Sequence, residues 1–129
     1  MDTVADFLTA IRNAGKAKHD KVDMPSSKIR VGIAEILLKN GFIRSYKVAK
    51  DSKQGIMRIY LKYSEQGVHS ITELKRASRP GRRYYLKSHA IPEVRSGMGL
   101  SILSTNNGIM SGADAKLKNV GGELLCTLW

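Results

Sequence analysis

The spacing of the apolar residues changes along this sequence, and this change constrains the fold more than any other feature. Between residues 4 and 11, and again between 29 and 37, apolar side chains recur at the three- and four-residue steps of an amphipathic helix. Residues 56–63 instead alternate between apolar and polar side chains, which is the period of a half-buried strand. Helical segments followed by a run of strands are typical of an α+β fold.

A polar stretch at residues 64–67 divides the chain near its middle. We interpret it as a linker between a helix-rich N-terminal α+β subdomain, residues 1–64, with a small sheet, and a C-terminal subdomain, residues 68–129. The C-terminal part is expected to be mostly antiparallel β-structure with one short helix that begins at Ser111. The 129 residues, 42% hydrophobic and 26% charged, suit one ordinary domain or two very small ones. The expected strands are 21–24, 42–48, 56–63, 71–77, 82–87, 100–105 and 123–129.

The chain carries 22 Lys and Arg residues against 11 Asp and Glu, which gives a formal net charge of +11. A small folded body repels itself at such a charge, so an anionic partner is the usual reason for it. Nucleic acid is the favoured partner. A membrane surface is disfavoured, because neither helical segment places basic residues beside a broad apolar stripe. We expect no membrane partner and no small-molecule substrate.

Sequence motifs for membrane insertion, metal binding and catalysis are missing. The apolar stretch at residues 31–38 is far shorter than the roughly 20 residues that cross a bilayer, and the acidic N-terminal segment does not resemble a signal peptide. His19, His69 and His89 are widely spaced, so we expect no metal site. Cys126 is the only cysteine, and its apolar neighbours predict a space-filling role in a strand. No phosphate-binding loop or nucleophile motif points to an enzyme or a cofactor.

Six basic residues fall within residues 75–87, where the sequence has no acid. They are Lys75, Arg76, Arg79, Arg82, Arg83 and Lys87. Tyr84 and Tyr85 are interleaved with them. Basic side chains neutralise phosphates, and aromatic rings stack on bases or pack on ribose, so this segment is a candidate RNA contact. The alternative is a solvated basic hairpin whose tyrosines belong to the core.

A second candidate is the turn made by Ser104, Thr105, Asn106, Asn107 and Gly108, shortly before the helix start at Ser111. Hydroxyls, amides and backbone N–H groups beside a helix N-terminus suit phosphate oxygens, ribose hydroxyls and base edges. The alternative is a turn and a capped helix with only a structural role. Glu123 is a third candidate, because a carboxylate can accept hydrogen bonds from bases or orient a nearby basic side chain. The alternative for Glu123 is a surface charge.

Several segments occur in the order seen in one known family. They are 5–14, 24–28, 58–63, 74–76, 78–81, 100–110, 115–116 and 121–126. Over essentially its whole length the chain therefore resembles bacterial small-subunit ribosomal protein eight. One position and one four-residue segment depart from the family pattern. Asn106 stands where the family usually has the second serine of Ser-Thr-Ser, so an amide replaces a hydroxyl, and residues 111–114 read Ser-Gly-Ala-Asp instead of Thr-Asp-Arg-Glu.

The resemblance implies a structural, non-enzymatic component of the small ribosomal subunit, a ribonucleoprotein of the cytoplasm that serves translation. It implies direct binding to the central domain of 16S rRNA and help in assembling the platform of the subunit. Many members of the family also repress translation of their own operon mRNA, and the fifth and twelfth small-subunit proteins are the expected neighbours. By motif match the expected RNA contacts are Ser104, Thr105, Asn106, Gly108, Glu123 and Tyr85, with Lys28 and Arg30 as further candidates in the N-terminal half.

Two other classes of function stay open on the residues alone. A less specific nucleic-acid binder, such as an RNA chaperone or a nucleoid protein, would account for the charge but not for the turn beside a helix start. An RNA-processing enzyme would need a general base, a nucleophile or a metal site, and the sequence offers none.

Overall fold

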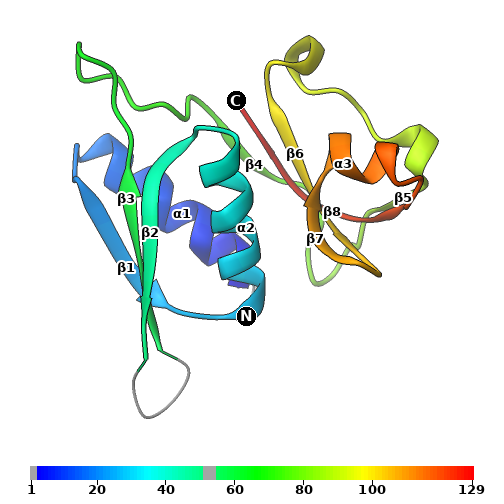
Figure 1. The fold of residues 1–129 in the computed structure, drawn as a ribbon, viewed down its shortest axis with the longest axis horizontal. Helices are drawn as coiled ribbons and strands as arrows, with labels where there is room; N and C mark the ends of the chain where they lie inside the picture. Colours follow the sequence, from blue (N-terminus) through cyan, green and yellow to red (C-terminus); the bar gives the residue numbers. More distant parts are fainter. Residues whose placement is uncertain (1–2, 51–54) are drawn as a thin grey trace.

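The computed structural model describes residues 3–50 and 55–129 (Figure 1). Its N-terminal half has two helices and a three-stranded antiparallel sheet with the strand order β1-β3-β2. The elements are α1 (Thr3–Lys16), β1 (Lys21–Pro25), α2 (Lys28–Lys39), β2 (Ile43–Ala49) and β3 (Ile56–Leu61). The C-terminal half is an antiparallel sheet with one short helix, so the predicted α+β class is confirmed.

The elements of the C-terminal half follow in chain order from residue 74. They are β4 (Leu74–Arg76), β5 (Tyr85–Leu86), the 3-10 turns η1 (Ser88–Ala90) and η2 (Arg95–Gly97), β6 (Leu100–Thr105), β7 (Gly108–Ser111), α3 (Gly112–Leu117) and β8 (Gly122–Leu128). The strand order is β4-β8-β6-β7, and β5 also pairs with β8. The strand that comes last among these therefore lies at the centre of the sheet.

Short-range side-chain contacts explain where α2 begins and ends. The Oγ of Ser27 accepts a hydrogen bond from the backbone N–H of Arg30 at 3.1 Å, which satisfies one free donor of the first turn. At the other end the Nδ2 of Asn40 donates to the carbonyl of Ile36 at 2.8 Å. Gly41 follows with a φ of +79°, a conformation that favours glycine at the end of a helix.

The two helices α1 and α2 lie between the two sheets, and α3 lies on the far side of the C-terminal sheet (Figure 1). One cluster of buried side chains joins Phe7 and Ile33 of the helices to Ile102 and Leu125 of the C-terminal sheet. A second, smaller cluster around Leu103 packs under α3. The two halves of the chain thus share a core, and the proposed division at residues 64–67 stays a prediction.

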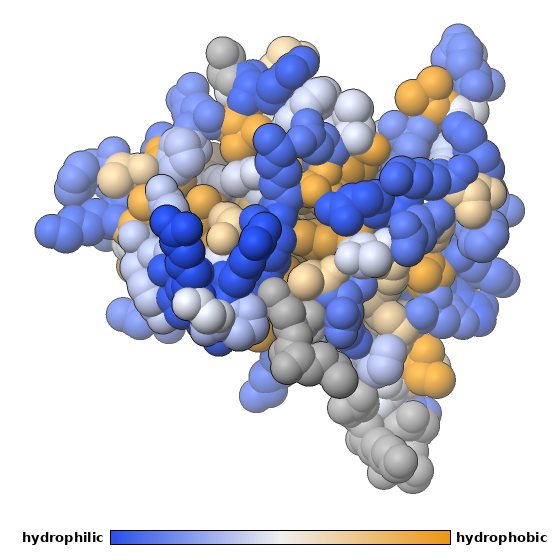
Figure 2. Space-filling view, turned by 180° about the vertical axis from the view of Figure 1, so that it is seen from behind, coloured by the Kyte–Doolittle hydropathy of each residue, from blue (hydrophilic) through white to orange (hydrophobic). Residues whose placement is uncertain are grey.

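One face of the molecule is seen in the space-filling view (Figure 2). Hydrophilic residues cover most of the face seen in Figure 2, and hydrophobic residues show through mainly near its centre. No helix among the described residues is long and apolar enough to cross a membrane. Cys126 is fully buried, and burial raises the pKa of its thiol to about 12, which suits the predicted space-filling role.

Candidate nucleic-acid interface

The basic segment lies along one side of β8, and the residues between its two strands form a loop there. The strands β4 and β5 pair in succession with the same strand, β8, and not with each other. The backbone N–H of Ser78 donates to the carbonyl of Leu124 at 3.0 Å, and the N–H of Leu124 donates to the carbonyl of Tyr84 at 2.8 Å. Both ends of the loop are therefore fixed at one residue of the central strand. We call residues 79–83 the basic loop.

The basic loop is closed by its own backbone. Arg79 and Arg82 exchange two backbone hydrogen bonds, of 3.0 and 2.9 Å, across the Pro80-Gly81 turn. This pairing leaves the side chains of Arg79, Arg82 and Arg83 exposed. The loop thus presents three guanidinium groups at a place that the sheet determines.

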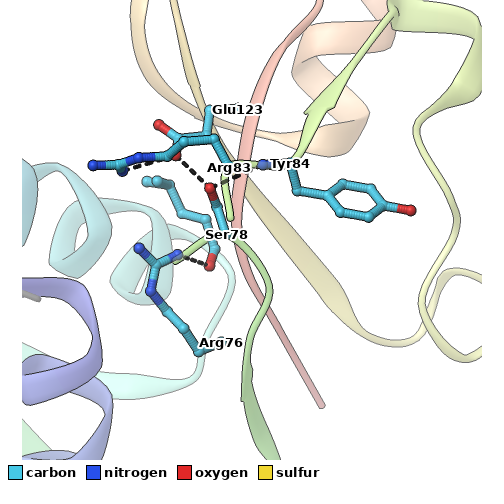
Figure 3. A network of polar contacts seen from close by, with 6 residues as sticks. Arg76, Ser78, Arg83, Tyr84 and Glu123 are labelled. Carbon is cyan, nitrogen blue, oxygen red and sulfur yellow. Dashed lines mark hydrogen bonds and ion pairs between the residues drawn. The ribbon is translucent and has the colours of Figure 1, made fainter. Parts of the chain in front are cut away.

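A buried serine connects the basic loop to Glu123 (Figure 3). The side chain of Ser78 is fully buried, and its Oγ accepts a hydrogen bond from the N–H of Tyr84 at 3.1 Å. The same hydroxyl donates to Oε2 of Glu123. Nη1 of Arg83 lies 3.0 Å from that oxygen. Ser78, Arg83 and Glu123, which we call the carboxylate network, therefore tie the loop to β8.

The charge of Glu123 is stabilised by these contacts. Its side chain is 15% exposed, and burial alone would raise its pKa. The hydrogen bonds from Ser78 and Arg83, together with the positive charges of Arg83 and Arg76, outweigh burial, so the pKa lies below its ordinary value. Glu123 is therefore an engaged carboxylate and not an isolated surface charge.

Three predicted contact residues form a row across three neighbouring strands. Glu123 of β8 is paired with Tyr85 of β5 on one side and with Ser104 of β6 on the other. Side chains of directly paired residues share a face of the sheet, so these three lie side by side. Tyr85 is 70% exposed and Tyr84 is 50% exposed, so neither tyrosine belongs to the core.

A hollow of about 160 Å³ opens beside this row. It is lined by Thr3, Val4, Ile29, Arg76, Pro80, Arg83, Ser104, Glu123 and Leu125. Residues of α1 and α2 form one wall, and the C-terminal sheet with its basic loop forms the other. Arg76 is held there by a hydrogen bond from Nη1 to the carbonyl of Leu125 (Figure 3).

The turn between β6 and β7 is stabilised from within by Thr105. Its Oγ1 accepts a hydrogen bond from the N–H of Asn107 at 3.1 Å and donates to the carbonyl of Gly108 at 2.8 Å. Among Asn106, Asn107 and Gly108, the glycine alone has a positive φ, +102°. The side chains of Asn106 and Asn107 are exposed. The hydroxyl of Thr105 thus shapes the turn, and the two amides face outward.

Two neighbouring motif residues, Ser111 and Gly122, have structural roles. The Oγ of Ser111 accepts a hydrogen bond from the N–H of Asp114 at 3.2 Å, which is the predicted cap of α3. A Cβ on Gly122 would lie 2.3 Å from the carbonyl oxygen of Ser104. Glycine is therefore required where β8 approaches β6 beside Glu123.

The remaining predicted site residues lie in different surroundings. Lys75 is exposed and forms an ion pair with Glu73 at 3.2 Å. Lys28 is exposed on the first turn of α2. Arg30 is 9% exposed, and its Nη1 donates to the carbonyl of Pro25 at 2.7 Å, so it is turned inward. Ser78 was not predicted, because nothing local distinguishes it from any other turn serine.

The described residues can also be compared with the needs of a metal centre. Within residues 3–50 and 55–129 no group of three or more His, Cys, Asp and Glu side chains is placed to hold a metal ion. The arrangement instead offers guanidinium groups, an exposed phenol ring, side-chain amides and one carboxylate on a preformed surface. These groups can bind phosphates, stack on bases and form hydrogen bonds with base edges.

Comparison with known proteins agrees with the resemblance found in the sequence. The family model described as Ribosomal protein S8 matches residues 2–129. The small ribosomal subunit protein uS8 of Bdellovibrio bacteriovorus is 68% identical over 129 residues, which cover the whole of both chains. Proteins of the same name from Geotalea daltonii and Clostridioides difficile are 52% and 50% identical over 128 residues, with 99% of this chain and 97% of each relative covered. The chain therefore belongs to the ribosomal protein S8 family, whose members are structural, non-enzymatic components of the small ribosomal subunit.

Proposed function

We propose that this protein binds directly to the central domain of 16S rRNA and helps to assemble the platform of the small subunit. The contact surface consists of the basic loop, the row of Tyr85, Glu123 and Ser104, and the Asn106–Gly108 turn. Lys75, Arg76 and Lys28 extend it with further positive charge, and Arg30 supports it from inside by holding Pro25. The N-terminal and C-terminal parts, residues 1–64 and 68–129, both contribute.

The carboxylate network is the observation that carries this proposal. A protein that only neutralises phosphates gains nothing from an acid among its arginines, because the acid repels the RNA backbone. Here Glu123 of β8 lies beside the basic loop, and its Oε2 is 3.0 Å from Nη1 of Arg83. Such a contact fixes the direction of a guanidinium before RNA arrives, which favours one RNA shape over others. The network therefore supports specific recognition over general RNA binding.

Each part of the surface has a distinct role in this proposal. The arginines of the basic loop bind phosphates, and the exposed ring of Tyr85 packs on a base or a ribose. The outward amides of Asn106 and Asn107 form hydrogen bonds with base edges or 2′-hydroxyls. Thr105 and Gly108 hold the turn in its shape. Glu123 acts mainly by holding Arg83 and Ser78, because both of these side chains contact its Oε2.

Two further parts of the proposal concern the protein's own mRNA and its neighbours in the subunit. An mRNA of the protein's own operon that imitates the rRNA element would bind in the same way, and the protein would then repress its own translation. Within the subunit, the fifth and twelfth small-subunit proteins are the proposed neighbours. Both roles depend on RNA recognition by the row and the basic loop.

Crosslinking in cells, followed by sequencing of the attached RNA, tests the proposal. We expect crosslinks concentrated in one region of the central domain of 16S rRNA. Titration against that RNA and a scrambled version at one salt concentration measures the preference. Equal affinity for both RNAs would support the alternative function, that of a nonspecific RNA chaperone or nucleoid-type protein. The net charge of +11 alone would be sufficient for such binding.

A further inference from the structure

The N-terminal sheet has one face that no other described element covers. The helices α1 and α2 pack on its inner face, through Met57 and Ile59 of β3. The opposite, outer face is made by the alternate residues of the three strands. In the register of the sheet, Lys21 and Ser45 flank Tyr60, and Asp23 and Lys47 flank Arg58.

Positive charge dominates this outer face. Lys21, Arg44, Lys47 and Arg58 contribute four cations, and Asp23 contributes one carboxylate. Arg58 binds Asp23 through two hydrogen bonds, of 2.7 and 3.0 Å. That pair neutralises itself, so the charges of Lys21, Arg44 and Lys47 remain for an anionic partner.

A single aromatic ring stands among these cations. The guanidinium carbon of Arg44 lies 5.6 Å from the centre of the Tyr60 ring, and the Nζ of Lys47 lies 5.7 Å from it. The irregular register between Ile43 and Ser45 places Arg44 within reach of this ring. Beside the ring is a hollow of about 280 Å³, lined by Asp23, Lys47, Ala49, Ile56, Arg58 and Tyr60.

We propose that this outer face is a second RNA-binding surface, which takes a segment of RNA other than the one held by the C-terminal half. Arg44, Lys47 and Lys21 would bind phosphates, while a ribose or a base packs against Tyr60 and the exposed side chain of Ile56. The combination of cations with an aromatic ring on a sheet favours RNA over an acidic protein segment, which would need only the cations. The inference rests on the proposed function, because it assumes an RNA-bound protein.

The position of the face explains why a separate segment is needed. The helix layer lies between the two sheets, so the outer face points away from the C-terminal sheet (Figure 1). An RNA element that lies along the basic loop does not reach it without wrapping around the molecule. A second surface would let the protein join two parts of a folded RNA, which is a useful property during assembly of a subunit.

The test compares two double variants of the full chain on two RNAs. Arg44→Gln with Lys47→Gln removes two charges from the outer face. Lys116→Gln with Lys118→Gln removes two exposed charges from α3 and its end, and serves as the matched control. The RNAs are the complete small-subunit rRNA and its shortest fragment that still binds the wild-type chain tightly. Thermal melts by circular dichroism verify that each variant is folded.

We expect the outer-face variant to bind the complete rRNA about tenfold more weakly and to bind the fragment normally. Its salt slope on the complete rRNA should be shallower by about 1.4 to 1.8, as expected for two lost phosphate contacts. Tyr60→Leu, which keeps every charge, should give a selective loss of about threefold or more on the complete rRNA. The control should change binding of both RNAs by one small, equal factor.

Three outcomes would overturn the second surface. One is an equal loss on both RNAs, and another is no loss on either. The third is selective loss of binding to a polyglutamate peptide with rRNA binding unchanged, which would assign the face to an acidic protein. Failure of the proposed function looks different, because the wild-type chain itself would then not prefer the fragment to a scrambled RNA.

Discussion

The hydroxyl of Ser78 donates a hydrogen bond to the carboxylate of Glu123, although 45 residues separate the two in the sequence. The contact joins the start of the basic loop to the central strand of the sheet. Because the same hydroxyl also accepts the N–H of Tyr84, it holds both ends of the loop at once. A buried serine with no access to RNA thereby determines where the exposed arginines lie.

Ser78→Ala should remove both bonds without changing the volume of the side chain much. We expect the free energy of unfolding to fall by about 1 to 3 kcal/mol, since a buried N–H and a carboxylate each lose a partner. Binding to the cognate RNA should weaken as well. Urea denaturation and RNA titration measure the two effects. Ser70→Ala, at a half-buried serine outside the carboxylate network, is the control and should change neither quantity appreciably.

Glu123→Gln should lower specificity more than affinity. The amide can still accept from Ser78, but the charge that orients Arg83 is gone. We expect cognate binding to weaken by about 1 kcal/mol, as for a partly exposed ion pair, while binding to scrambled RNA stays equal or becomes slightly tighter. Parallel titrations at one salt concentration give the ratio. A rise of both affinities together would mean that Glu123 has no part in recognising the cognate RNA.

The carboxylate network also predicts a dependence of stability on pH. The pKa of Glu123 is lowered in the folded protein from its ordinary value of 4.5. Its contribution to stability is therefore fully present above about pH 4.5 and is lost as the pH falls through the folded-state pKa. Unfolding free energies measured from pH 7 to pH 3 should decline less steeply for Glu123→Gln. Identical pH profiles for the two proteins would contradict this role of the carboxylate.

RNA binding should depend strongly on salt. If roughly 5 phosphates are neutralised, log K should fall with log[salt] at a slope of about −3.5 to −4.5. Changing Arg79 and Arg82 of the basic loop to Gln should reduce the slope by about 1.4 to 1.8. A titration series from low to physiological salt measures both values. A wild-type slope near zero would contradict the electrostatic part of the proposal.

Thr105→Val should act on the turn before it acts on RNA. The hydroxyl makes two hydrogen bonds inside the turn, so its loss should cost about 1 kcal/mol of stability. Asn106→Ala leaves those bonds intact and should weaken RNA binding with little effect on stability. Comparing the two variants by thermal melting and RNA titration separates shape from contact. Unchanged RNA affinity for folded Asn106→Ala would remove its amide from the interface.

Local features of this fold were predictable from sequence. The helix expected around residues 29–37, the strand at residues 100–105 and the alternation of β3 all depend on neighbouring residues, and the structure confirms them. The family could also be identified from the sequence, because the resemblance rests on motifs of contiguous residues. Family membership confirms that the protein is a structural, non-enzymatic component of the small ribosomal subunit.

Long-range features were not predictable from the pattern alone. The basic segment was expected to form two short strands with a turn between them, a pattern that favours a hairpin. In the structure both strands pair with β8 instead. The partners of Glu123 could not be identified either, since Ser78 and Arg83 reach it only through that pairing. Arg30 was a candidate RNA contact by its family resemblance, but no sequence pattern shows that its side chain is buried and donates a hydrogen bond to the carbonyl of Pro25.

The central position of β8 has a consequence for synthesis. Translation produces β4, β5 and β6 first. The strands β4 and β5 pair only with the later strand β8, residues 122–128, and β6, which pairs with β7 on one side, needs β8 on the other. Until then the nascent chain carries open strand edges and an uncovered flank on α1 and α2, which are the features that chaperones bind and that cause aggregation. A stall in translation before residues 122–128 are made would therefore leave β4 and β5 without the strand that they pair with.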